Sequence, residues 1–233
     1  MTPVVAAEDV WKYYGDYPAL REIQFGVEPG SCVALLGRNG AGKTTLLRII
    51  AGFSKAGRGR VTIFGKDARD PETRRRVGVL GHGISVYEEL SAAENLMLFG
   101  RLYGVENPAR SAEAWLERTG LSPVRDGLVR EFSRGMRQRL AVARAFLHDP
   151  EVLLLDEPFT ALDDRAIAVL QTVLREALAR RCTIVLSTHQ LREALELATH
   201  VALLARGRLA YHGERTAEML ADPGWLYARY GEA

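Results

Sequence analysis

The sequence has almost no net charge and no long apolar run, and each absence excludes a class of protein. Its 31 basic and 29 acidic side chains leave a formal net charge of +2 over 233 residues, so a strongly basic nucleic-acid binder is not expected. No segment approaches the roughly 18 uninterrupted apolar residues of a membrane-spanning helix. Residues 1–5 lack the basic and apolar regions of a secretory signal. We therefore expect a cytoplasmic chain whose membrane contacts go through a partner.

Cysteine is also scarce. Cys32 and Cys182 both lie in short apolar runs, whereas a disulfide framework needs more cysteines in a shorter chain. We predict two buried thiols in a reducing compartment. Apolar residues make up 47% of the chain and charged residues 26%, which excludes a long disordered protein. The length suits one large domain, or a domain with an inserted lobe.

Short apolar segments bounded by glycine or charged residues predict strands near both ends of the chain. We expect the first sixty residues to form short strands, and we expect further strands over residues 31–36, 61–64, 77–80, 152–155 and 182–186, with an antiparallel pair at 201–204 and 208–212. Helices are expected over residues 44–51, 91–103, 108–119, 134–147 and 164–180. Three of these helices follow one another in the middle of the chain. The fold class is therefore α/β with an inserted helical lobe, and the basic run at 69–76 is expected to be a solvated loop.

A glycine-rich loop after the strand at 31–36 carries the clearest chemistry. It matches the phosphate-binding loop pattern in full, with a strand before it and a helix after it, through residues Gly37, Arg38, Asn39, Gly40, Ala41, Gly42, Lys43 and Thr44. The glycines let successive backbone N–H groups point at phosphate oxygens beside the start of the helix. Lys43 is expected to reach between the β- and γ-phosphates and Thr44 to bind Mg²⁺, and Thr45 is counted among the nucleotide-binding residues.

Polar residues at the ends of two other apolar strands complete this predicted site. Asp156 and Glu157 follow the strand at 152–155; we expect Asp156 to hold Mg²⁺, partly through water, and Glu157 to polarise an attacking water. His189 follows the strand at 182–186 and is either a γ-phosphate contact or an ordinary strand-end residue. Ser133 and Gly135 open the helix at 134–147, where they predict a second anion site and suggest a nucleotide shared between two chains.

The order of these motifs resembles an ABC-type ATPase, the nucleotide-binding subunit of an ABC transporter, over residues 4–215. The resemblance implies a single ATPase domain over residues 1–215, with a RecA-like core at 1–83 and 151–215, an N-terminal antiparallel β part and a helical lobe at about 84–150. Residues 216–233 remain as a short C-terminal segment, expected to pack on the body as a helix.

The same resemblance implies a role for each site residue. Tyr14 stacks on adenine, Glu157 is the catalytic base and His189 the switch histidine. Ser133 and Gly135 contact the γ-phosphate of ATP held by a second subunit, and Asp163 communicates across that dimer. The implied cofactors are ATP and Mg²⁺. The implied partners are a second copy of the chain and an integral-membrane permease that holds it on the inner face of the cell membrane; no direct contact with nucleic acid or with the transported substrate is implied.

One departure from the family pattern concerns the reaction. Family members carry a glutamine just after the strand at 77–80, but this chain has no glutamine between Gln24 and Gln138. His82 or Gly83 takes that place instead. Either His82 substitutes as a hydrogen-bonding group or the contact is missing, and in the second case hydrolysis is expected to be slow.

Several further strings resemble the ATPase subunit of the haem exporter of cytochrome c maturation. They are residues 81–82, 87–90, 94–96, 99–105, 132–139 and 156–163. That resemblance implies haem export, and another ABC exporter, of the drug, lipid or polysaccharide type, is the alternative. A soluble ABC-type ATPase acting on ribosomes or DNA is disfavoured because those proteins usually fuse two ATPase units or insert long coiled coils. A small-molecule kinase does not explain Ser133 and Gly135.

Overall fold

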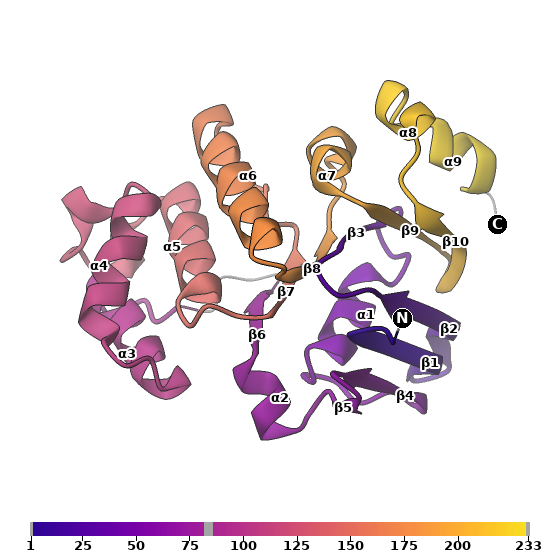
Figure 1. Cartoon of the computed structure of the whole chain (residues 1–233), viewed down its shortest axis with the longest axis horizontal. Coiled ribbons are helices and arrows are strands. Elements are labelled where there is room, and N and C mark those ends of the chain that lie inside the picture. Colours follow the sequence, from indigo (N-terminus) through magenta and orange to yellow (C-terminus); the bar gives the residue numbers. More distant parts are fainter. Residues whose placement is uncertain (1, 82–85, 232–233) are drawn as a thin grey trace.

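A six-stranded sheet runs through the middle of the molecule in the computed structural model, which describes residues 2–81 and 86–231 (Figure 1). The strand order is β10-β9-β3-β8-β7-β6, and all neighbours are parallel except the β9–β10 pair. The strands are β3 (Cys32–Leu36), β6 (Val77–Leu80), β7 (Val152–Asp156), β8 (Thr183–Ser187), β9 (His200–Ala205) and β10 (Arg208–Glu214).

Both faces of this sheet are covered, because every residue of β3, β7 and β8 is buried. Alternate side chains point to opposite faces: Leu153 and Leu155 enter one apolar cluster, while Val152 and Leu154 enter a second one. The unbroken apolar runs of the sequence are therefore explained by parallel strands buried on both sides.

The second cluster lies between the central sheet and a four-stranded antiparallel sheet, with α1 (Lys43–Ile50) packed into it. The strands of the antiparallel sheet are β1 (Val5–Tyr14), β2 (Tyr17–Val27), β4 (Arg58–Ile63) and β5 (Lys66–Asp67), in the order β2-β1-β4-β5. The prediction of short strands here was wrong: β1 has 10 residues and β2 has 11. Register shifts and a positive φ at Asp9 and Glu22 interrupt the alternation of buried and exposed side chains along these strands. Each strand therefore reads in the sequence as several shorter ones.

The middle of the chain forms the expected helices, α3 (Ala92–Tyr103), α4 (Pro108–Arg118) and α5 (Arg134–Phe146). Ser91 and Glu94 form the predicted capping box at the start of α3. Two short 3-10 turns, Ser122–Val124 and Val129–Glu131, join α4 to α5. The prediction of a loop over residues 69–76 was wrong, because Asp70 caps a short helix, α2 (Pro71–Arg75).

The first cluster covers the other face of the central sheet and includes the helices α3 to α5 as well as α6 (Asp164–Ala179), α7 (Leu191–Leu197), α8 (Ala217–Ala221) and α9 (Trp225–Tyr230). Figure 1 shows α8 and α9 beside β10. The fold class is the predicted one, a mixed α/β phosphate-loop ATPase fold with an antiparallel β part and a helical region. The division at residue 215 stays a prediction.

Both cysteines are buried and free. Burial raises the pKa of each thiol to about 12, so neither is a reactive thiolate at neutral pH. Among the described residues, no helix is both long and apolar enough to span a membrane.

Candidate functional site

Three neighbouring parallel strands, β3, β8 and β7, end at the same edge of the central sheet, where ligands bind in open α/β sheets. The phosphate loop follows β3, while Asp156 and Glu157 lie at the end of β7. His189 lies just after β8. Segments far apart in the sequence therefore meet at one edge.

The phosphate loop is shaped by glycines at positions that reject a side chain. Gly42 is the N-cap of α1 with a φ of 108°. A Cβ there would meet Cδ2 of Leu20 at 2.7 Å and the carbonyl oxygen of Ala19 at 2.9 Å. Glycine alone fits this backbone without strain, and it turns the loop directly into the start of α1, where backbone N–H groups are free to bind an anion.

Lys43 lies inside this loop, with only 7% of its surface exposed. Its Nζ donates to the carbonyl oxygen of Gly37 at 2.7 Å and to that of Arg38 at 3.3 Å. Burial lowers the pKa of Lys43, and the carboxylates of Glu157 and Asp156 partly oppose that change. The ammonium group is thus held among backbone oxygens beside the two predicted catalytic and metal-binding carboxylates.

A cavity of 500 Å³ opens over the loop. The residues that line it include most of the predicted nucleotide-binding set, with Tyr17 and Ala19 in addition: Tyr14, Tyr17, Ala19, Asn39, Gly40, Ala41, Gly42, Lys43, Thr44, Thr45 and Glu157. Tyr14 is 55% exposed, so its ring is available for stacking on a flat ligand. Gly37 and Arg38 lie at the start of the same loop, outside this lining.

Asp156 and Thr44 present oxygen donors near this cavity. Asp156 is buried at the end of β7, where it accepts a hydrogen bond from the hydroxyl of Ser187. Thr44 is the second residue of α1 and lines the cavity. A carboxylate and a hydroxyl fit Mg²⁺, which takes few protein ligands and keeps several waters and phosphate oxygens. In the described part of the chain no group of three or more His, Cys, Asp or Glu is placed to hold a metal.

Glu157 and His189 contact one another directly. Glu157 Oε2 lies 2.8 Å from Nδ1 of His189 and accepts from the His189 backbone N–H at 3.3 Å. Glu157 has a φ of 54°, an uncommon conformation for a residue with a side chain. Its backbone N–H donates to the carbonyl oxygen of Ser187 at 2.8 Å, which ties β7 to β8 at this point. His189 therefore holds the carboxylate that lines the cavity, and Ser187 holds its backbone.

Ser133, Gly135 and Asp163 do not join this group, since none is among the described residues that line the cavity. Ser133 is exposed and caps α5 by accepting from the Met136 backbone N–H at 3.2 Å. Asp163 caps α6 in the same way through Ala166 at 2.8 Å. A Cβ on Gly135 would lie 2.9 Å from the carbonyl oxygen of Ala161, so the start of α5 packs against the loop that leads to Asp163.

His82 and Gly83, which stand where family members carry the glutamine, lie outside the described residues. The predicted roles of the individual site residues stay predictions.

The sequence family described as ABC transporter matches residues 20–160. The chain belongs to this family. It is 38% identical over 218 residues, 92% of this chain and 72% of the relative, to the Nod factor export ATP-binding protein I of Cupriavidus metallidurans. It is 37% identical over 200 residues to the ABC transporter ATP-binding protein NatA of Bacillus subtilis, covering 84% of this chain and 81% of that one.

A solved ATP-binding subunit of an ABC transporter superposes with a TM-score of 0.85 at 30% identity, over 98% of this chain and 95% of that one. This chain is therefore an ATP-binding subunit of an ABC transporter and an ATPase. ABC membership accounts for the order of the motifs along the chain, and it agrees with the family resemblance inferred from the sequence.

Three residues beside this ABC site were missed by sequence reasoning. Tyr17 lies opposite Tyr14 in the β1–β2 pair and lines the cavity; the aromatic pair flanking Gly15 and Asp16 was a visible hairpin signal. Ser187 binds Asp156, which the parallel register of β7 and β8 explains. Tyr227 accepts a hydrogen bond from Gly37, which lies 190 residues earlier in the chain, and no local sequence pattern predicts such a contact.

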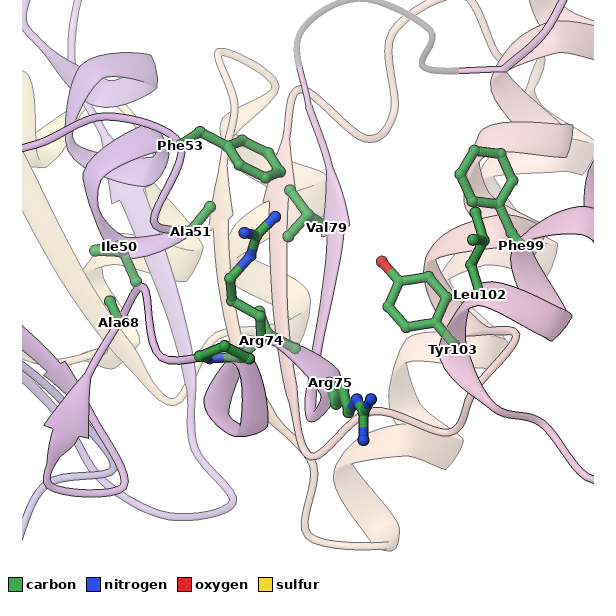
Figure 2. Close-up of a pocket in the computed structure, with 12 residues that line it drawn as sticks. Ile50, Ala51, Phe53, Ala68, Arg74, Arg75, Val79, Phe99, Leu102 and Tyr103 are labelled. Carbon is green, nitrogen blue, oxygen red and sulfur yellow. The ribbon is translucent and has the colours of Figure 1, made fainter.

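A second cavity, of 330 Å³, lies away from the strand ends. Figure 2 shows its two sides: Ile50, Phe53 and Arg74 lie on the side of α1 and α2, and Phe99, Leu102 and Tyr103 project from α3 on the other side. Phe53 is 55% exposed and Leu102 is 66% exposed. This ABC subunit therefore presents apolar side chains to solvent at the junction between α1, α2 and the helical region.

Proposed function

We propose that this chain binds and hydrolyses ATP at the cavity over the phosphate loop to power a separate membrane permease. The observation that carries the proposal is the meeting of the phosphate loop, Asp156, Glu157 and His189 at one edge of the central sheet. The surrounding strands are buried, so these groups sit on a rigid support.

The residues of this site suit phosphoryl transfer, which depends on positioning and on electrostatic stabilisation. The backbone N–H groups of the loop and the start of α1 hold the phosphates, and Lys43 supplies a positive charge to them. Glu157 is placed to accept a proton from an attacking water, with His189 orienting its carboxylate through the 2.8 Å contact. Thr44 and Asp156 would hold Mg²⁺, which neutralises phosphate charge when bound.

The positions of the exposed Ser133 and the half-buried Gly135 support a shared site. They retain the Ser and Gly of the family motif yet do not line this chain's own cavity. In the proposed head-to-tail dimer they meet the γ-phosphate of the ATP held by a second copy, and Asp163 lies between the two sites. ATP then closes the dimer and its hydrolysis reopens it.

The cavity between α1, α2 and α3 is the surface that we propose for the permease. Its apolar side chains, Phe53 and Leu102, lie beside the cationic Arg74 and Arg75. An amphipathic helix with apolar and acidic side chains complements that combination. Such a contact would hold the chain on the cytoplasmic, inner face of the cell membrane.

The transported substrate follows from the permease and not from this subunit. The relative from Cupriavidus metallidurans is named for Nod factor export, which favours the alternative prediction of another ABC exporter. Haem export rests only on the short sequence strings that resemble the haem exporter subunit. A strain that lacks this chain distinguishes haem export from export of another substrate. Loss of covalently attached haem in a haem-stained gel supports haem export, and normal staining rejects it.

The test of the transport function is affinity purification of the tagged chain from its own membranes in mild detergent, with mass spectrometry of the partners. A multi-span protein is expected to co-purify. Leu102→Glu should lose that protein, whereas Leu220→Glu, an equally drastic change at a 43% exposed position on α8, should keep it. Recovery of ribosomes or soluble partners alone would overturn the transport role.

The ATP site is tested separately by Lys43→Ala. Removing the phosphate-directed cation is expected to weaken nucleotide binding at least tenfold. Unchanged ATP affinity in this variant would reject the assignment of the phosphate loop.

A further inference from the structure

The C-terminal helix α9 is firmly attached to the body of the ATPase. Leu226 is 1% exposed and belongs to the apolar cluster that covers the central sheet. Tyr230 packs on Tyr211 of β10 with ring centroids 5.1 Å apart, and Trp225 meets Tyr230 edge-on at 6.2 Å. These contacts fix the direction in which the remaining side chains of α9 project.

One of those side chains reaches the phosphate loop. The Gly37 backbone N–H donates to the hydroxyl of Tyr227 at 2.9 Å. The carbonyl oxygen of the same glycine accepts from Nζ of Lys43 at 2.7 Å. Both backbone polar groups of Gly37 are thus used, one by α9 and the other by the lysine that is expected to bind phosphate.

Gly37 has little freedom to move away from this contact. A Cβ at this position would lie 2.6 Å from the carbonyl oxygen of Leu204 and 3.1 Å from Cβ of Ala41. Gly37 is itself buried, where an N–H without a partner is costly. Tyr227 also lines, with Arg38 and Asn39, a cavity of 320 Å³ on its side of the loop. Burial raises the pKa of Tyr227, although the Gly37 contact opposes this, so its hydroxyl is neutral at physiological pH.

We propose that Tyr227 is a positioning residue for ATP binding, which fixes the start of the phosphate loop by accepting the hydrogen bond of Gly37. The proposal rests on the phosphate loop being the ATP site. Without the hydroxyl, the loop samples more conformations before ATP binds, and ordering it then opposes binding. The bound geometry is unchanged, so turnover at saturating ATP is preserved.

The test uses the full chain with Tyr227→Phe, which removes the hydroxyl and keeps the ring. The matched control is Tyr230→Phe, which removes a hydroxyl from the same helix without touching the loop. We expect Tyr227→Phe to weaken ATP binding about three- to tenfold, the size of one hydrogen bond, and to raise KM with kcat within about twofold. Tyr230→Phe should leave both unchanged.

Hydrogen exchange of the nucleotide-free chain gives a second readout. The peptide that spans residues 37–43 should exchange faster in Tyr227→Phe than in the wild type or in Tyr230→Phe. Unchanged affinity and exchange in Tyr227→Phe would overturn the positioning role, and so would an equal effect of the control, which would indicate a general loosening of α9. Failure of the wild type itself to bind ATP would instead reject the ATP site.

Discussion

Lowering the pH is expected to destabilise the protein through His148, which lies largely buried after α5. Its ring stacks on Tyr103 with centroids 3.8 Å apart and planes 1° apart. Neither ring nitrogen has a described hydrogen-bond partner, although the backbone of Val77 lies close enough to raise the pKa in part. Burial dominates, and with the Arg144 cation it lowers the pKa of His148 from 6.5 to about 4.

The sign of the effect follows from proton binding. Between about pH 6.5 and 4 the unfolded chain binds a proton on His148 that the folded chain does not, so stability falls as the pH falls through this window. One pKa unit corresponds to about 1.4 kcal/mol. The shift from 6.5 to about 4 therefore gives a loss of about 2 kcal/mol at pH 5, which approaches about 3 kcal/mol below pH 4.

Urea denaturation of the wild type and of His148→Phe at pH 7 and pH 5 measures this term. Phenylalanine keeps a flat ring against Tyr103 and does not titrate. The acidic side chains are the same in both proteins, so their contribution to the pH dependence cancels in the comparison. On lowering the pH, the wild type should lose about 2 kcal/mol more unfolding free energy than the variant. Parallel losses in the two proteins would show that His148 accepts a proton without cost and would refute the reasoning.

Three other changes have defined outcomes. Glu157→Gln should trap a dimer at saturating ATP, seen by gel filtration, because the variant removes the proposed base and the negative charge near the phosphate. If the ATP-bound variant stays monomeric, the dimer does not form without the permease. Gly42→Ala should weaken ATP binding strongly and cost about 2 kcal/mol or more of stability, because a Cβ would meet Leu20 at 2.7 Å and φ is 108°. An ATP affinity equal to that of the wild type would show that the loop relaxes to accept the side chain. Asn95→Leu should cost about 2–4 kcal/mol in chemical denaturation, because Tyr87 and Ser91 lose hydrogen bonds of 2.7–2.9 Å to a fully buried amide; an unchanged midpoint would mean that water replaces the amide.

Most of the fold could be predicted from local patterns. The strand at β7 was predicted because a parallel strand buried on both faces must be apolar throughout, and the start of α3 was predicted because Ser91 and Glu94 satisfy two backbone N–H groups locally. The length of β1 and β2 was not predictable. Their register depends on pairing partners and on bulges that interrupt the alternation of side chains.

In the candidate site, too, residues in local motifs were predictable and long-range contacts were not. The phosphate loop and the strand-end residues Asp156 and Glu157 were visible because short motifs carry their own chemistry. The contact of Tyr227 with Gly37 was not, because it depends on how α9 packs at the far end of the chain. Nor does the sequence show that Ser187 binds Asp156, since that needs the register of two strands 31 residues apart.

The shared apolar cluster that joins α3, α5, α6 and α7 across one face of the central sheet has a mechanical consequence. A well-packed interior has low compressibility and transmits strain. A force applied to α3 at the exposed Leu102 would be transmitted through α5 to the N-terminus of that helix, where Ser133 is the N-cap. The helix length sets the distance over which the force is transmitted. At 1.5 Å per residue, the 13 residues of α5 span about 20 Å.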